Sequence, residues 1–411
     1  MKDNQAKYPQ LRFKGFTYPW EKRKLGKWFA ERTERSGEGE MLSVTISSGV
    51  VRANSLDRKD NSSTDKSNYK VVHIGDIAYN SMRMWQAASG VSNYDGIVSP
   101  AYTVLVPAAE VSSVFFGYQF KQTKMKQIFQ RNSQGLTSDT WNLKYPLLAK
   151  IKTSAPQKTE QVKIGTFFAT LDHLIAVNQR KLAKLKELKQ GYLQKLFPEN
   201  GSKFPQLRFA GFADAWEQRK FESLLNKNDG IRRGPFGSAL KKEFFVPKSE
   251  YVVYEQQNAI YDNYKTRYNI TKKKFDELSR FELRPNDFIM SGAGTIGRIS
   301  RVPNDIKKGV FNQALIRFRI NTSITDSEYF VQFIRADFMQ RKLTNANPGS
   351  AITNLVPMSE VKKWIIQFPN LKEQQKIGTF FQQLDHLITL HQRKLEKLQE
   401  LKKGYLQKMF C

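Results

Sequence analysis

The sequence predicts two mixed α/β (α+β) globular domains in tandem, joined by two long helices that pair as an antiparallel coiled coil, with the whole chain a pseudo-two-fold tandem repeat. Three observations predict this fold class. The opening of the chain returns near its middle, a long helical segment returns at its end, and the stretches between them carry both strand and helix patterns. Hydrophobic residues make up 40% of the 411 residues, which is enough for packed cores and excludes a disordered basic tail.

The duplication is visible as two matched segments. The sequence PQLRFKGF at 9–16 returns as PQLRFAGF at 205–212, and in both copies a Trp-Glu pair follows after three residues. A longer segment, 160–197, matches 373–410 at 28 of 38 positions. The offset grows from 196 to 213 residues, so the second intervening body is 17 residues longer than the first. Matches of this length indicate a tandem duplication with a constant frame and divergent bodies.

The repeat divides the chain into four segments. They are a first domain at 1–157, a first spacer helix at 158–203, a second domain at 204–370 and a second spacer helix at 371–411. Because the frame is kept while the bodies differ, the duplication suggests a pseudo-symmetric scaffold that presents two different binding domains.

Each closing segment has the pattern of a helix with a heptad seam, because its seam residues alternate at spacings of four and three. The interface residues expected on the seam are Leu171, Ile175, Leu182, Leu185 and Tyr192 in the first helix and Leu384, Ile388, Leu395, Leu398 and Tyr405 in the second. From its first seam leucine each helix spans about 40 Å. An apolar stripe must be buried, and the twin helix is the obvious partner. The alternative is that each helix packs on its own domain.

Both bodies are mixed in pattern. Strand-like stretches rich in β-branched and aromatic residues are Tyr69–Ile74, Ala101–Val106, Phe288–Ser291 and Ala314–Ile320. Helical spacing of apolar residues runs through Val114–Arg131 and Ser327–Leu343. Each body is therefore expected to combine strands with helices.

The bodies contain no motif of a catalytic site. Residues 292–297 have the glycine spacing of a dinucleotide-binding loop, but the next residues alternate like a strand and include Pro303, where a phosphate site needs a helix N-terminus. We therefore predict a β-hairpin there. Walker A, nucleophile-elbow and HExxH motifs are absent. The single cysteine, Cys411, and the lack of zinc spacing among the four histidines predict no metal site.

The charge balance points to a polyanionic partner. The sequence holds 67 Lys and Arg against 38 Asp and Glu, a formal net charge of +29 that is spread over domains and helices alike. Nucleic acid is the usual partner of such a surface, and the alternative is a basic protein that is merely soluble. Arg and Lys neutralise phosphates, while Arg, Asn and Gln can read base edges. The candidate DNA-binding residues are Arg83, Trp85, Arg232, Arg233, Lys241, Lys242, Arg298, Arg301, Asn312 and Gln313.

The sequence also indicates where the protein is expected to work. No apolar stretch is long enough to cross a membrane, and the first residues are polar rather than leader-like. A single cysteine fits a reducing compartment. We expect a cytoplasmic protein with no membrane association.

The whole plan resembles the specificity subunit of a type I restriction-modification system. The residues that carry the resemblance in the first half are Pro156, Glu160-Gln161, Ile164, Leu171-Asp172 and Ile175, and in the second half Pro369, Glu373-Gln374, Ile377, Leu384-Asp385 and Ile388. Gly75-Asp76-Ile77 and Asp287-Phe288-Ile289 are similar to segments of the family's target recognition domains. The resemblance covers essentially the whole chain.

The resemblance implies a subunit without catalytic residues or cofactors of its own. Such a subunit holds two target recognition domains apart on two conserved helices and reads a split, asymmetric site on double-stranded DNA, one half by each domain. It docks two modification subunits, which methylate adenine with S-adenosylmethionine, and restriction subunits, which use ATP and Mg. The competing hypothesis is a coiled-coil scaffold outside restriction-modification that binds nucleic acid, RNA included, or serves assembly alone.

Overall fold

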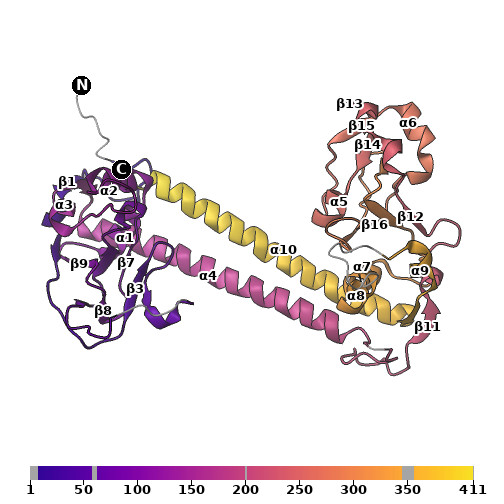
Figure 1. The fold of residues 1–411 in the computed structure, drawn as a ribbon, viewed down its shortest axis with the longest axis horizontal. Coiled ribbons are helices and arrows are strands. Elements are labelled where there is room, and N and C mark those ends of the chain that lie inside the picture. Colours follow the sequence, from indigo (N-terminus) through magenta and orange to yellow (C-terminus); the bar gives the residue numbers. More distant parts are fainter. Residues whose placement is uncertain (1–7, 58–62, 200, 345–355, 411) are drawn as a thin grey trace. The chain divides into compact units, whose positions relative to one another are not determined.

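The computed structural model describes residues 8–57, 63–199, 201–344 and 356–410, which form two compact units (Figure 1). Unit 1 comprises the chain up to Arg180 together with the segment from Arg393 onward, and unit 2 comprises Lys181–Gln392. Both long helices, α4 (Lys158–Lys195) and α10 (Leu371–Lys408), therefore belong to unit 1 at one end and to unit 2 at the other. The boundary between the compact units therefore falls inside the two spacer helices, whereas the sequence repeat predicts boundaries at the ends of these helices.

Unit 1 is built on a four-stranded antiparallel sheet of order β2-β9-β6-β7. Its strands are β1 (Glu21–Lys24), β2 (Phe29–Glu31), β3 (Leu42–Thr45), β4 (Gly49–Arg52), β5 (Lys70–Val72), β6 (Ile77–Asn80), β7 (Ser89–Val91), β8 (Gly96–Val98), β9 (Tyr102–Pro107) and β10 (Lys152–Ala155). Its short helices are α1 (Ser113–Phe120), α2 (Thr123–Asn132) and α3 (Tyr145–Leu148). Three two-stranded pairs, β1-β10, β3-β4 and β5-β8, complete the described strands.

Unit 2 repeats the main sheet and the outer strand pair of unit 1, although the two bodies show little sequence similarity. Its main sheet has the order β12-β19-β16-β17, and β11 pairs with β20 as β1 pairs with β10. The strands are β11 (Glu217–Lys220), β12 (Ile231–Arg233), β13 (Phe245–Val246), β14 (Tyr251–Tyr254), β15 (Tyr268–Ile270), β16 (Phe288–Ser291), β17 (Ile299–Arg301), β18 (Gly309–Phe311), β19 (Leu315–Phe318) and β20 (Ile365–Phe368). The helices are α5 (Gln256–Tyr261), α6 (Lys272–Glu277), α7 (Ser327–Arg335), α8 (Asp337–Thr344) and α9 (Met358–Lys363). Where unit 1 has the pairs β3-β4 and β5-β8, unit 2 has a second four-stranded sheet, β13-β15-β14-β18, in which β14 and β18 are parallel.

The predicted strands all form, but each long helical pattern is interrupted. The segment expected to run over Val114–Arg131 is two helices, α1 and α2, and Ser327–Leu343 is likewise α7 and α8. Gln122 and Ala336 adopt extended backbone angles at the breaks. Each break redirects the chain so that apolar residues of both helices enter one core, which continuous helical spacing alone does not reveal.

The two long helices run antiparallel within each unit. In unit 1 the Phe167 ring contacts Tyr405 and Asp172 binds Lys402, so numbering rises on α4 as it falls on α10. In unit 2 Tyr192 contacts Phe380, and Lys189 Nζ lies 2.6 Å from Asp385. All ten seam residues predicted from the heptad spacing are buried or half-buried.

Each body takes core residues from both helices, so both packing hypotheses hold in part. The core of unit 1 includes Ile164 and Phe168 of α4 and Met409 beyond the end of α10. The core of unit 2 includes Phe381 of α10 and Phe197 just after α4. The helices therefore pack on each other and also complete the domain at either end.

The repeated opening segments fasten the helices to the bodies. Arg12 makes a bidentate bond to the buried Glu160 at 2.6 and 2.7 Å, and Arg208 binds the buried Glu373 in the same way at 2.7 and 2.8 Å. Such paired, charge-assisted hydrogen bonds fix both position and orientation. The constant frame residues thus have a structural role, which explains why they recur in both copies.

A candidate nucleic-acid interface

A closely packed turn, Gly234-Pro235-Phe236-Gly237, follows β12 in unit 2. The Gly234 N–H donates to Leu315 O at 3.0 Å. A Cβ added at Gly234 would lie 1.9 Å from Asn312 O, and one at Gly237 would lie 2.6 Å from Gln313 Oε1. Only glycine allows this close approach, so the turn is packed directly onto the Asn312-Gln313 segment that precedes β19.

This packing creates a basic hollow of 810 Å³. Its lining includes Arg232, Arg233, Phe236, Arg280, Ala293 and Gln313, and none of its lining residues is acidic. A second hollow of 150 Å³ lies on the other side of the turn and is lined by Lys242, Asn312 and Gln313 among others. Five of the ten sequence-predicted candidates therefore meet at one surface.

A carboxylate network beneath the turn holds β12 in place. Asp229 accepts hydrogen bonds from the buried Arg317 and from Arg319, and from Arg232 at 2.9 Å. Burial would raise the pKa of Asp229, but hydrogen bonds from Arg317 and Arg232 lower it to about 2. Arg232 is thus bound within the protein, and its role is first to position the turn.

The remaining candidates of unit 2 are placed less uniformly. Arg301 lies on β17 and binds Glu328 at 2.9 Å and Asn286 Oδ1 at 2.6 Å, so its guanidinium is already engaged. β16 pairs with β17 in antiparallel fashion, which confirms that the glycine-rich segment between them is a hairpin and not a nucleotide loop. Arg298 is exposed on this hairpin. Lys241 is exposed, with Glu243 3.8 Å away.

In unit 1 the equivalent β6–β7 hairpin carries Arg83 and Trp85. Arg83 is exposed, and the Trp85 ring makes an edge contact with Trp141, with 5.3 Å between ring centroids. Trp141 ends the loop after α2 that also presents the fully exposed Leu136. Unit 1 therefore offers aromatic and apolar groups beside its hairpin, where unit 2 offers three arginines, a phenylalanine and an amide.

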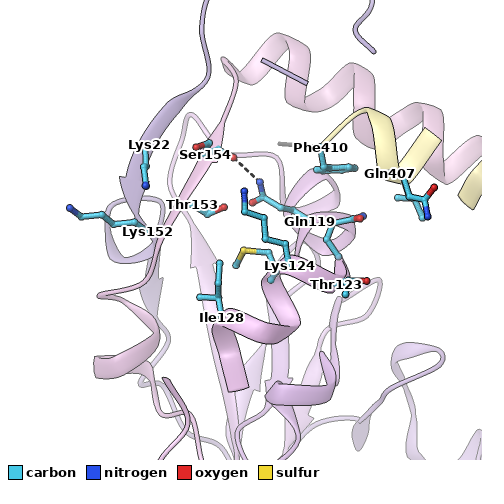
Figure 2. Close-up of a pocket in the computed structure, with 13 residues that line it drawn as sticks. Lys22, Gln119, Thr123, Lys124, Ile128, Lys152, Thr153, Ser154, Gln407 and Phe410 are labelled. Atoms are coloured by element: carbon cyan, nitrogen blue, oxygen red, sulfur yellow. Dashed lines mark hydrogen bonds between the residues drawn. The ribbon is translucent and has the colours of Figure 1, made fainter. Parts of the chain in front are cut away.

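The two units also differ where the helix ends meet the body. A hollow of 630 Å³ in unit 1 is lined by Lys22, Lys124, Lys152 and Gln119, whose Nε2 donates to Ser154 O at 2.7 Å (Figure 2). In unit 2, Phe333 of α7 and Phe338 of α8 pack with their ring centroids 5.6 Å apart. This hollow includes none of the residues predicted to bind DNA.

Four residues of these surfaces had no signal in the sequence. Phe236 and Leu136 belong to segments with turn composition, while Arg280 and Trp141 reach the surfaces only through the fold. The buried Asp76 and Asp287, by contrast, are structural: Arg32 binds Asp76 at 2.8 Å, and Arg319 binds Asp287 at 2.7 Å. Among the described residues there is no group of three His, Cys, Asp or Glu side chains placed to hold a metal, and no helix fit to span a membrane.

The two bodies share the order of their main sheets but carry unlike surface residues. Residues 216–400 match the family of the type I restriction modification DNA specificity domain. The chain is 20% identical over 361 residues to the putative type I restriction enzyme MjaX specificity subunit of Methanocaldococcus jannaschii, covering 82% of this chain and 78% of that protein. It is 19% identical over 295 residues to the MjaVIII specificity subunit of the same organism, covering 70% and 67%.

Solved structures agree on the fold. The S subunit of a type I restriction-modification system from M. genitalium superposes with a TM-score of 0.57 at 12% identity, over 98% of this chain and 99% of that one. A chain from a structure of the type I R-M system gives a TM-score of 0.53 at 14% identity, over 96% and 99%. Residues 216–400 thus match the family's DNA specificity domain, and over most of its length the chain is similar to specificity subunits of type I restriction-modification systems.

Proposed function

We propose that this subunit reads a bipartite, asymmetric DNA site, with one half recognised by each unit. The observation that carries the proposal is that the two units share the order of their main sheets but carry unlike surface residues. Unit 1 presents Arg83 and Trp85 at its hairpin, and unit 2 presents Arg233, Phe236 and Gln313 around its basic hollow. Arginine and glutamine are the side chains that read guanine and adenine edges in the major groove, and different sets read different sequences.

A selection experiment tests this function. Purified chain with its modification subunit is used to enrich duplexes from a random pool. The expected result is one motif with two specific blocks separated by unspecified positions, bound with an affinity that falls steeply with salt because many phosphates are neutralised. Enrichment of RNA over DNA, or no motif at all, would instead favour the scaffold hypothesis.

The long helices provide the surface that we propose for docking two modification subunits. Four leucines in repeat-equivalent pairs are 39–45% exposed, Leu174 and Leu401 in unit 1 and Leu188 and Leu387 in unit 2. Beside Leu401 a hollow of 500 Å³ is lined by Leu11, Leu401, Gly404 and Tyr405. A Cβ built at Gly404, or at its repeat equivalent Gly191, would meet nothing within 4 Å. A glycine inside a helix costs stability but allows another backbone to come close, so its presence at both positions supports one docking face on each unit.

Charge substitutions on these faces should change the number of bound modification subunits. Leu401→Glu and Leu188→Glu are each expected to reduce it from two to one, and the double variant to none, because a carboxylate in an apolar contact is strongly unfavourable. Native mass spectrometry of the complex measures the count. Gln399→Glu, which adds the same charge at another exposed α10 position, is the matched control and should keep two. Two bound copies on the double variant would refute this docking surface.

The remaining activities are proposed for the partner subunits. S-adenosylmethionine would serve the modification subunits, and ATP with Mg the restriction subunits, while this chain binds no cofactor. We place the complex in the cytoplasm, where its DNA substrate would be.

A further inference from the structure

Phe236 is an exposed aromatic residue of unit 2. The DNA contacts proposed above for arginine and amide side chains give it no role. Its side chain is 89% exposed, although burying a phenylalanine ring is strongly favourable. A single exposed apolar residue is by itself ordinary. Phe236 differs from such a residue in the turn that holds it and in the residues that surround it.

The turn that carries Phe236 is fixed on both sides. Pro235 is buried, and the Ala239 N–H donates to Phe236 O at 2.9 Å. Gly234 and Gly237 are in close contact with the backbone and side chain of the 312–313 segment, as described above. The ring is therefore held out on a rigid support, so a partner that accepts it loses little conformational entropy on binding.

The residues around the ring indicate which kind of partner it would fit. Phe236 stands between the two hollows. The larger one brings Arg232, Arg233 and Arg280 to its side with no carboxylate in the lining. The smaller one adds Lys242 and one carboxylate, Glu255, which Arg267 binds at 2.9 Å. An apolar ring beside a mainly basic surface suits a ligand that combines flat apolar faces with negative charge. Stacked bases bordered by phosphates have this combination, whereas an apolar protein surface does not.

We propose that the Phe236 ring enters the DNA duplex as an apolar wedge and stacks on a base of the half-site read by unit 2. Arg233 and Arg280 contact the flanking phosphates, and Gln313 contacts a base edge beside the wedge. This inference rests on the proposed function and adds the residue that deforms the DNA. Apolar side chains inserted between base steps unstack them and kink the duplex, so the wedge selects for a step that unstacks easily.

The test uses the duplex enriched by the wild-type protein with its modification subunit. Phe236→Ala should bind it about 10- to 100-fold more weakly, the range expected for losing one base–aromatic stack. Its salt dependence should stay unchanged because no phosphate contact is removed. Phe236→Trp should bind within a few-fold of wild type. Phe204→Ala removes another exposed ring of unit 2, which is 54% exposed and lies in the segment between α4 and β11, and it should bind as wild type.

A spectroscopic measurement separates a wedge from a mere contact. 2-Aminopurine is placed at each position of the half-site in turn, and its fluorescence should rise at one step with wild type and Phe236→Trp but not with Phe236→Ala. Wild-type affinity and an unchanged fluorescence rise in Phe236→Ala would overturn the wedge and leave DNA recognition standing. Loss of modification-subunit binding in Phe236→Ala would also overturn it, in favour of a protein contact. A wild-type protein that binds no duplex would refute the proposed function itself.

Discussion

Asp229→Ala is expected to destabilise unit 2 by about 3 kcal/mol, within the range found when one partner of a buried ion pair is removed. The fully buried Arg317 donates to Asp229, while its Nε and Nη1 have no hydrogen-bond partner among the described residues. Without the Asp229 carboxylate that guanidinium stays buried with no paired anion and keeps the backbone oxygen of residue 229, now 3.1 Å from Nη2, as its acceptor. The loss is a large fraction of the stability of an ordinary domain.

Thermal and urea unfolding measure this loss. Asp229→Asn keeps an oxygen acceptor and should fall between the alanine variant and wild type. Asp305→Ala removes an exposed carboxylate from the same unit and is the matched control, expected to change little. An alanine variant as stable as wild type would show that the network does not support β12.

The same network predicts an acid dependence of stability. Because the folded pKa of Asp229, about 2, lies below the ordinary value of 3.8, its carboxylate stabilises the folded state fully above about pH 5. That contribution is lost as the pH falls towards 2. Asp229→Asn should lack this part of the acid transition, so its stability should approach that of wild type at low pH.

The sequence was most informative where structure depends on local periodicity. The heptad spacing from Leu171 and from Leu384 predicted the helices and their buried seam, and alternation after Arg298 distinguished a hairpin from a nucleotide loop. The helix breaks at Gln122 and Ala336 escaped prediction because helical spacing continues through them. Only packing against a common core decides where each helix turns.

The candidate interface could be predicted only in part, because its residues meet through long-range contacts. Asn312 and Gln313 were identified as possible base readers, but their packing against Gly234 and Gly237 depends on the pairing of β12 with β19. The number of arginines in the sequence does not reveal which of them are already paired, such as Arg301, whose guanidinium binds Glu328. An exposed ring on a turn likewise has no sequence pattern, because turn composition predicts only the turn.

The matching outer strands of the two bodies permit a stringent exchange. The strands that begin and end each body, β1 with β10 and β11 with β20, pair in the same way and join the same repeated frame. Residues 217–368 can therefore replace residues 21–155, giving a chain with two copies of the second body. Unfolding measurements and binding of two modification subunits establish that this chain is folded and assembled.

The recognised motif of this exchanged chain tests most directly whether each body reads its own half-site. Selection from random duplexes should give wild type an asymmetric split motif, and the exchanged chain a palindromic one in which the half-site of the second body occurs twice in inverted orientation. The block lost from the motif should be the one read by the first body. An unchanged asymmetric motif, or a single contiguous motif for either chain, would contradict the account.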